Sequence, residues 1–566
     1  MHRSELAKAL RLVPPERRKP SFCKKLSDKA IRKWADGLPV MEFDKLIVNV
    51  MAAMQELADI DTHCDTLLAA LELVMPKVAL CKPELVKLYS KTTSEDSHEG
   101  IEALERAQAL DEYVLTAYGR VLLDKKLSVS DIGLAAVRVM ESCFEILQRC
   151  AHLYIDPPPL VWAYLYRIHE LADTKKITST DYPLIFRSSE SRSVDDLFFR
   201  CILFASASTA QLHKEKMVEL EALLPHMTEW VKWGPLKSMD EALFMVDVSD
   251  FRPPTYRKPV DALVTSMKGL DLTALMTELG QKQNNRFRGL INRELKDHLQ
   301  KIWSEQPLRE GDRQLVQSRV KILVGIYDIY GSLTQGQTAN DFITEHHPKN
   351  PAHIQARFAQ NEAIEPEWLE CQLEDIKTDG SGVRLIVFKM PSGLASGDVI
   401  ALQFVDKMHV GIVKWLKADE DGGCQIGVQF TSRSVQPCVL LGLSREGYWT
   451  DPSAGLVSVM DMDGESRQKI ICHRASFEKA KGLKFYTVHN VSYVHFVGKE
   501  AITGSVLVAT FEPIDPLDLP DQKLRPMSSN MSEGRETLNQ KPSKGSDAPP
   551  PPGSGFGSDK PPLDFF

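Results

Sequence analysis

The stretch Val410-Gly-Ile-Val-Lys-Trp415, with Asp419-Glu-Asp-Gly-Gly423 and Ile426-Gly-Val-Gln-Phe430 after it, decides the fold of the C-terminal half. Its two outer segments carry apolar residues with a period of two, which is typical of half-buried β-strands. The middle segment is acidic and rich in glycine, as hairpin turns are. The stretch therefore predicts a β-hairpin.

Further short strands surround this hairpin. The same alternation predicts strands over Val320–Ile326, Val383–Val387 and Val399–Phe404. Turn signals separate them at Pro391-Ser-Gly393 and Ser396-Gly-Asp398. Several short strands at this spacing predict a small barrel. A second β-rich stretch is expected over residues 456–511, including Val491–Val497 and Ser505–Phe511.

Before residue 300 the apolar period changes to that of an α-helix. In Phe43–Ile60, one buried stripe is formed by Leu46, Val50, Met54 (or Ala53) and Leu57. The same pattern predicts helices over Asp131–Tyr154, Leu160–Ala172, Asp195–Ala210 and Lys214–Trp230. Thr174–Arg192 is polar and is expected to be a loop between helical halves. Since no internal repeat of fixed length is found, we expect a bundle or a solenoid-like stack without a named repeat.

The two ends of the chain have unusual compositions. The first 33 residues hold eleven Lys and Arg against three Asp and Glu, a local charge of +8. This segment could contact anionic lipid, RNA or an acidic partner, but a solvated and partly frayed arm is the simpler interpretation. Ser543–Phe566 is rich in Pro, Gly and Ser, so a disordered tail is expected there. Its apolar tip, Leu563-Asp-Phe-Phe566, could dock into a partner or be a plain disordered end.

The overall composition narrows the class of protein. A chain of 566 residues can form two to four domains, and the net charge of −8 argues against a general DNA- or RNA-binding protein. No apolar run approaches the roughly 18–20 residues that span a bilayer. The start, Met1-His-Arg-Ser-Glu5, lacks the apolar stretch of a signal peptide. We therefore expect a cytoplasmic protein without a transmembrane segment.

Neither the cysteines nor the histidines suggest a metal centre. The ten cysteines are scattered without a CxxC pair, so we interpret them as structural thiols. His346, His347 and His353 lie in a loop without a carboxylate cluster. GxxxxGK[ST], GxSxG and HExxH motifs do not occur. The sequence therefore predicts neither an enzyme nor a cofactor.

Taken together, the patterns predict a multidomain α + β chain. The expected parts are a basic arm (1–30), a helical region (31–300, with a break near 174–192), a β-barrel (301–440), a β-rich subdomain (441–515) and a disordered tail (516–566).

Charged residues stand at the entry to two of the expected barrel strands. Arg309-Glu-Gly-Asp-Arg313 precedes the first strand, and Glu374-Asp-Ile-Lys-Thr-Asp-Gly-Ser-Gly382 follows Trp368 and leads into the strand at Val383. A guanidinium group offers a planar fork of donors that suits both phosphate oxygens and the O6/N7 edge of guanine. Glycine lets backbone N–H groups approach a phosphate closely.

This order of motifs resembles the PilZ domain, a family of bacterial cyclic di-GMP receptors. The family carries RxxxR at the start of the domain and D/N-x-S-x-x-G at the entry to a barrel strand. The resemblance covers about residues 305–440. The helical region is similar to the N-terminal part of a subgroup of larger PilZ-like proteins, mainly over Ile31–Leu57 and from Arg309 through Val320–Tyr330.

The resemblance implies a non-catalytic receptor whose ligand is cyclic di-GMP. The implied ligand-binding residues are Arg309, Arg313, Asp375, Lys377 and Gly380. Asp375 would accept the N1–H and N2–H groups of guanine, and the two arginines would close over the ligand from a strand leader. Lys377 stands where the family usually has serine. An alternative alignment from Asp379 restores Ser381 but places Arg384 at the glycine position.

Two functions follow from this motif, and the sequence leaves both open. In the first, cyclic di-GMP orders the arginine leader against the barrel. In the second, a degenerate barrel has lost the ligand, and the chain is an adaptor that binds an unknown protein through its helical region. The arginine pair favours the receptor, and the lysine at position 377 favours the adaptor.

Overall fold

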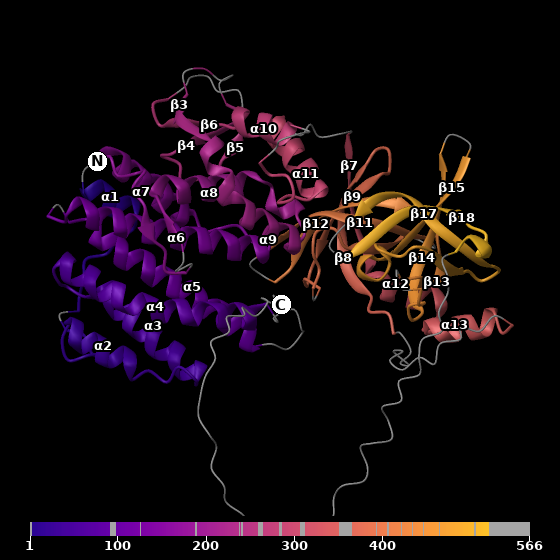
Figure 1. The fold of residues 1–566 in the computed structure, drawn as a ribbon, viewed down its shortest axis with the longest axis horizontal. Coiled ribbons are helices and arrows are strands. Elements are labelled where there is room, and N and C mark those ends of the chain that lie inside the picture. Colours follow the sequence, from indigo (N-terminus) through magenta and orange to yellow (C-terminus); the bar gives the residue numbers. More distant parts are fainter. Residues whose placement is uncertain are drawn as a thin grey trace, which may run out of the picture.

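The computed structural model describes the chain from Arg3 to Leu519. The residues that it leaves undescribed within this range are 18, 91–97, 125, 187–189, 237, 239–241, 258–263, 282–285, 306–311, 350–364, 392, 405–406, 420–421, 433, 445–446, 463–464 and 503–504. A helical region is followed by two β-barrels that lie at one end of it (Figure 1). The expected disordered tail falls almost entirely outside the described residues.

The helical region is built around α6 (Val129–His152), which is buried along most of its length. Helices α5 (His98–Val121), α7 (Pro159–Lys175) and α8 (Val194–Ser206) pack on it. The remaining helices of this layer are α2 (Asp28–Asp36), α3 (Phe43–Asp59), α4 (Cys64–Tyr89) and α9 (Lys214–Leu223). All five helices expected from the apolar period are therefore confirmed.

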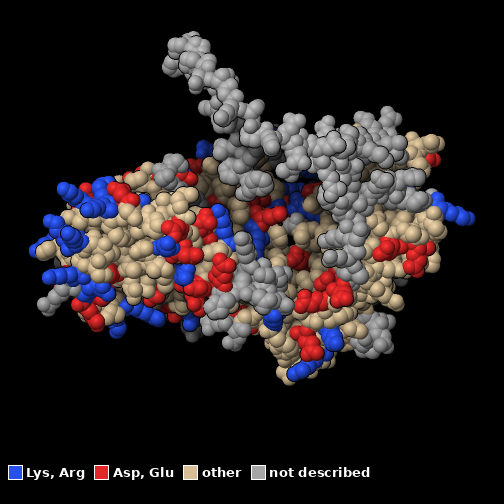
Figure 2. All heavy atoms as spheres, turned by 90° about the horizontal axis from the view of Figure 1, so that it is seen from below, with Lys and Arg blue, Asp and Glu red and all other residues tan. Residues whose placement is uncertain are grey.

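The basic N-terminal segment is folded onto this region. Helix α1 (Arg3–Ala9) buries Leu6, and Leu10 just after it is buried as well. Arg17 forms an ion pair of 3.0 Å with Glu56 of α3. The expectation of a solvated, frayed arm is wrong for the described residues, because apolar side chains four residues apart give α1 a buried face. Lys and Arg side chains gather at the end of the helical region that lies away from the barrels (Figure 2).

Residues 232–304 depart from the expected run of helices. A four-stranded sheet of order β3-β6-β4-β5 lies over α7 and α8 and is followed by two helices (Figure 1). Its elements are β3 (Lys232–Pro235), β4 (Phe244–Asp247), β5 (Thr255–Tyr256), β6 (Met267–Asp271), α10 (Thr273–Gly280) and α11 (Arg293–Ser304). Strands of two to five residues are too short to show a period of two. A small hairpin, β1 (Tyr182–Pro183) and β2 (Ser191–Arg192), lies in the expected loop.

The first barrel is closed by six antiparallel strands in the order β7-β8-β9-β12-β11-β10. The strands are β7 (Arg313–Val324), β8 (Leu369–Lys377), β9 (Gly382–Val387), β10 (Val399–Phe404), β11 (Lys407–Ala418) and β12 (Cys424–Ser432). The five strands expected here are confirmed, except that the first begins at Arg313 and ends at Val324, because Ile326 starts a helix. The strand β8 is an addition. Helices α12 (Ile326–Thr334) and α13 (Ala339–His346) follow β7.

The second barrel repeats this topology, with the strand order β13-β14-β15-β18-β17-β16. Its elements are β13 (Val435–Gly442), β14 (Ser453–Met462), β15 (Glu465–His473), α14 (Arg474–Phe477), β16 (Leu483–Tyr486), β17 (Val491–Ile502) and β18 (Val506–Pro513). A helical region followed by a barrel and a further β-rich unit is therefore confirmed as the fold class, and the further unit is itself a closed barrel.

The first barrel and the helical region share one continuous hydrophobic core. Tyr154 connects them with two hydrogen bonds to the barrel and makes a third within the helical region. Its hydroxyl donates to the Leu212 carbonyl (2.9 Å) and accepts from the Ser396 N–H (3.2 Å), and its carbonyl accepts from the Ala418 N–H (2.9 Å). The second barrel has its own interior core. A third cluster, around α12 and α13, lies between the outer faces of the two barrels.

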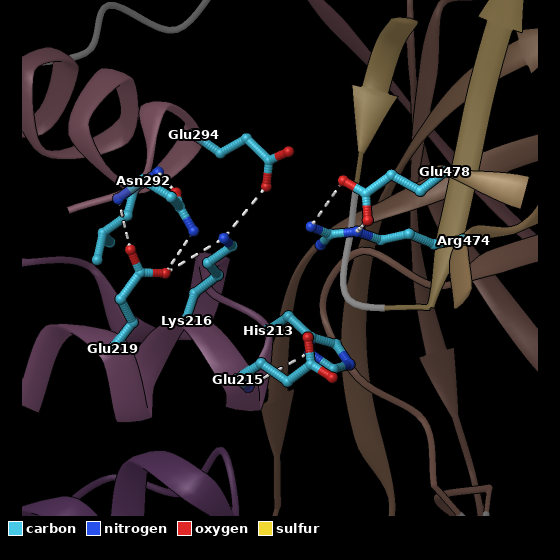
Figure 3. A network of polar contacts seen from close by, with 9 residues as sticks. His213, Glu215, Lys216, Glu219, Asn292, Glu294, Arg474 and Glu478 are labelled. Carbon is cyan, nitrogen blue, oxygen red and sulfur yellow. Dashed lines mark hydrogen bonds and ion pairs between the residues drawn. The ribbon is translucent and has the colours of Figure 1, made fainter. Parts of the chain in front are cut away.

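A polar network faces the second barrel across its boundary with the helical region (Figure 3). Lys216 of α9 forms ion pairs of 3.3 Å with Glu219 and with Glu294 of α11. Opposite them, Arg474 of α14 pairs with Glu478 at 3.0 Å. The contact here is therefore charged, whereas the helical region and the first barrel meet through apolar side chains.

Two further features bear on function. Within the described residues, no helix is both long enough and apolar enough to cross a membrane. All ten cysteines are free thiols, and all except the half-buried Cys64 are buried.

Candidate functional site

The residues predicted to bind the ligand meet at one corner of the first barrel. Arg313 begins β7 and stands opposite Lys377, the last residue of β8. The turn between β8 and β9 follows, with Gly380 at a φ of +68°, a conformation that other residues adopt only under strain. The Gly380 N–H donates to the Lys377 carbonyl at 2.8 Å, and the Ser381 N–H donates to the Asp379 carboxylate at 2.8 Å.

Asp375 is the centre of this corner. Its side chain is 5% exposed, and its two oxygens form ion pairs with two arginines from the flanking strands. One oxygen contacts the Arg313 guanidinium, and the other lies 2.8 Å from Nη2 of Arg384. Arg384 also lies 2.7 Å from the Glu374 carboxylate. Because a buried carboxylate without partners would cost free energy, the two guanidinium groups stabilise the charge of Asp375.

Irregular pairing brings these side chains together. The register shifts between Leu315 and Ser318 on β7, and again between Leu373 and Asp375 on β8. A β-bulge changes the direction in which the following side chains point, and bulges often lie next to binding sites. Here the second shift sets Asp375 directly opposite Arg384.

The cations and acids of the corner balance one another. Its cations are Arg313, Arg384 and Lys377, and its acids are Asp375, Glu374 and, in the turn, Asp379. The arginine side chains are 36% and 37% exposed, so each is partly open to solvent. The arrangement therefore offers donors for an anion beside a carboxylate that accepts hydrogen bonds.

Four of the five predicted residues share this corner, and Arg309 lies outside the described residues. Sequence reasoning missed Arg384 as a partner of Asp375. A signal was present, because the two residues lie at equal distances from Asp379-Gly380, and a hairpin centred on that dipeptide pairs them. Seeing it required recognising β8 as a strand.

His346 and His347, which were expected in a loop, lie at the end of helix α13 and have structural contacts. His346 packs against the ring of Phe342, and Nε2 of His347 contacts the Thr487 carbonyl at 2.5 Å. His353 lies outside the described residues. No group of His, Cys, Asp and Glu suited to a metal ion occurs in the part of the chain that the structure describes.

Comparisons with known proteins point to one kind of receptor. Residues 29–236 match the family model described as "Cyclic-di-GMP receptor FimW, N-terminal domain". A curated relative, the cyclic-di-GMP receptor FimW from Pseudomonas aeruginosa, is 20% identical over 594 aligned residues, which cover 91% of this chain and 95% of the relative. No solved structure matches the chain significantly. The chain is thus similar to the cyclic-di-GMP receptor FimW over nearly its whole length, and its helical region matches the N-terminal domain family of that receptor.

Proposed function

We propose that this chain is a cytoplasmic, non-catalytic receptor for cyclic di-GMP. In this proposal the first barrel is of the PilZ type and binds the ligand at the corner of β7, β8 and β9. The single observation that carries the proposal is the meeting of Arg313 and Arg384 at the buried carboxylate of Asp375. The similarity to a cyclic-di-GMP receptor along almost the whole chain supports it.

The ligand would bind by exchanging ion pairs. Cyclic di-GMP has two anionic phosphates, which can take a guanidinium group away from Asp375. The N1–H and N2–H groups of guanine can then donate to the carboxylate in place of that arginine. Because each charged group keeps a partner throughout, the exchange avoids leaving a buried charge unpaired.

The proposed signal is the ordering of the arginine leader. Arg309 precedes β7 by four residues and would join Arg313 on the ligand, while Lys377 and Gly380 would contribute a cation and a backbone N–H from the turn. Such a disorder-to-order change is biased by the ligand's greater affinity for one state. The first barrel shares its core with the helical region, so a change at its corner can reach that region.

Binding should be tested on the full chain by calorimetric titration with cyclic di-GMP. Arg313→Ala should weaken binding roughly tenfold to a hundredfold, because it removes charge-assisted hydrogen bonds worth about 1.5–3 kcal/mol. Arg313→Lys should also be costly, since an ammonium group cannot reproduce the planar fork. Arg319→Ala is the matched control, because Arg319 is an exposed arginine on the same strand.

The second candidate function is an adaptor that has lost the ligand. It is favoured by Lys377 in the usual serine position and by the two ion pairs that already occupy Asp375. An adaptor would show no heat of binding at high micromolar ligand. It would instead act through protein contacts of the helical region. Lys377→Ser separates the two functions further, since it should preserve or improve affinity in a receptor.

A further inference from the structure

A cleft separates the helical region from the small sheet that lies over it. It encloses about 520 Å³ between α7 and α8 on one side and β3 and β6 on the other. This volume is in the range of small-molecule sites in proteins. The cleft lies on different elements from the barrel corner, and most of its residues fall within the segment that matches the FimW N-terminal domain.

Aromatic rings form one wall of this cleft. The rings of Trp233 and Tyr166 are nearly parallel, with centroids 6.4 Å apart and an interplanar angle of 10°. Phe198 meets Trp233 edge-on at 5.3 Å, which fixes the orientation of the indole. Trp233 is only half-buried and lines the cleft. The cleft therefore presents a rigid, flat surface on which a planar ring can stack.

Most of the charged groups that line the cleft are already paired. His169 lies 2.9 Å from Asp195 and stacks on Phe198 with ring centroids 4.0 Å apart. Burial alone would raise the pKa of Asp195, but hydrogen bonds from His169 and Thr178 bring this pKa below its usual value, so Asp195 is a carboxylate at neutral pH.

The two remaining cations differ. Arg167 pairs with Glu170 at 2.9 Å. The Lys268 ammonium group of β6 has no acidic partner among the described residues. Asp173, the remaining acid, lies exposed at the rim. A half-buried lysine that no acid neutralises is suited to a ligand anion.

We propose that this cleft binds a nucleotide whose base stacks on Trp233 and whose phosphate contacts Lys268. Stacking on an aromatic wall tolerates different bases, and the lysine adds affinity for the anionic group. The inference does not depend on the proposed barrel site.

GMP and AMP are the probes, with guanosine and adenosine as matched ligands that lack phosphate, measured by calorimetry on the full chain. The expected result is binding of both nucleotides, tighter than that of the nucleosides. Lys268→Ala should weaken nucleotide binding by about tenfold and leave nucleoside binding unchanged, because only the phosphate contact is removed. Lys232→Ala is the control, since this exposed lysine stands beside Trp233 on β3 and points to the opposite face.

Variants at the two sites keep the inferences separate. Nucleotide binding should persist in Arg313→Ala, and Trp233→Phe should retain most of it because a flat ring remains. Absence of GMP and AMP binding at about 1 mM, a threshold of very weak affinity, would overturn the proposal. Equal loss in Lys268→Ala and Lys232→Ala would overturn it too. Cyclic di-GMP binding at the barrel corner could still hold in either case.

Discussion

The two barrels have the same strand order, but they differ in the side chains that begin the first strand and in what they pack against. Each closes six antiparallel strands in the order first, second, third, sixth, fifth, fourth. The first barrel starts with Arg313, which reaches across to Asp375. The second starts with Val435 and has Pro437 two residues later. A shared topology therefore predicts no shared site, because the chemistry depends on the side chains at one corner.

The barrels also differ in what they pack against. The core of the first is continuous with that of the helical region, whereas the interior of the second forms a separate cluster. The second barrel meets the helical region through the charged residues of Figure 3. The first barrel is therefore expected to respond together with the helical region, and the second to be coupled to that region less directly, through its apolar contact with the first barrel.

The largest expected effect is a loss of affinity for cyclic di-GMP. It tests whether only the first barrel binds this ligand. The double variant Arg309→Ala/Arg313→Ala should weaken cyclic di-GMP binding by roughly a hundredfold or more, since two charge-assisted contacts are lost. Arg474→Ala in the second barrel should leave the affinity unchanged. Calorimetric titration measures both. Unchanged binding in the double variant would refute the barrel corner as the site.

A second prediction compares the two cores by thermal unfolding. Leu385 in the first barrel and Leu507 in the second are both fully buried. Replacing either with alanine should cost about 2–5 kcal/mol of unfolding free energy, from lost burial and the cavity left behind. Leu385→Ala should lower the transition of the helical region as well, and Leu507→Ala should lower a separate transition. Identical calorimetric profiles for both variants would show that the barrels unfold as one unit.

A smaller effect is expected at the link between the helical region and the first barrel. Tyr154→Phe removes the hydroxyl that bonds the Ser396 N–H and the Leu212 carbonyl, and both of those residues are buried. Leaving these groups unsatisfied should cost about 1–3 kcal/mol. The measurement is the free energy of unfolding in urea. A loss no greater than in Tyr448→Phe, a tyrosine of the second barrel, would show that the link is dispensable.

The smallest effect is a dependence on pH at the contact with the second barrel. Burial lowers the pKa of His213. The nearby carboxylates of Asp398 and Glu215 raise this pKa in part, and the cations Lys214 and Arg474 lower it further. The folded state therefore binds a proton less readily than the unfolded chain, whose histidine pKa is about 6.5. This contribution to stability is present above about pH 6.5 and is lost as the pH falls towards the folded pKa.

His213→Asn keeps an acceptor for the Glu215 N–H and should reduce the loss of melting temperature between about pH 7.5 and pH 5.5. His489→Asn, at an exposed turn, is the control. Burial raises the pKa of the nearby Asp398, so this group acts in the opposite direction and gains stability as it is protonated at lower pH. An unchanged pH profile in His213→Asn would place the dependence on His298 or His473, whose pKa values burial also lowers.

Sequence periodicity was enough for the long helices and for most barrel strands. The strand β10 begins and ends where the alternation of Val399–Phe404 does. The apolar period did not reveal β8, because Glu374 and Asp375 interrupt the apolar pattern and a bulge changes its phase. The apolar period also did not reveal the sheet of β3–β6, whose short strands are stabilised by packing on α7 and α8. Such packing depends on tertiary contacts that local sequence does not contain.

Only part of the candidate corner could be predicted from the sequence, because its residues also meet through tertiary contacts. Arg313 and Asp375 are 62 residues apart, and a family motif was needed to associate them. The pairing of Asp375 with Arg384 follows from hairpin register once β8 is known. The cleft lined by Trp233 and Lys268 left no sequence signal. It lies between two helices that the apolar period predicted and a sheet that local patterns did not reveal.

The buried thiols give the chain a built-in set of probes for local opening. Burial raises the pKa of Cys371 and Cys424 in the first barrel to about 12, and it raises the pKa of Cys438 and Cys472 in the second as well. A thiol that is neither exposed nor ionised reacts with alkylating reagents only after its surroundings open. The labelling rate of each cysteine, followed by mass spectrometry, therefore reports the opening of its own barrel. A ligand that slows the labelling of one pair and not the other would show which barrel it closes.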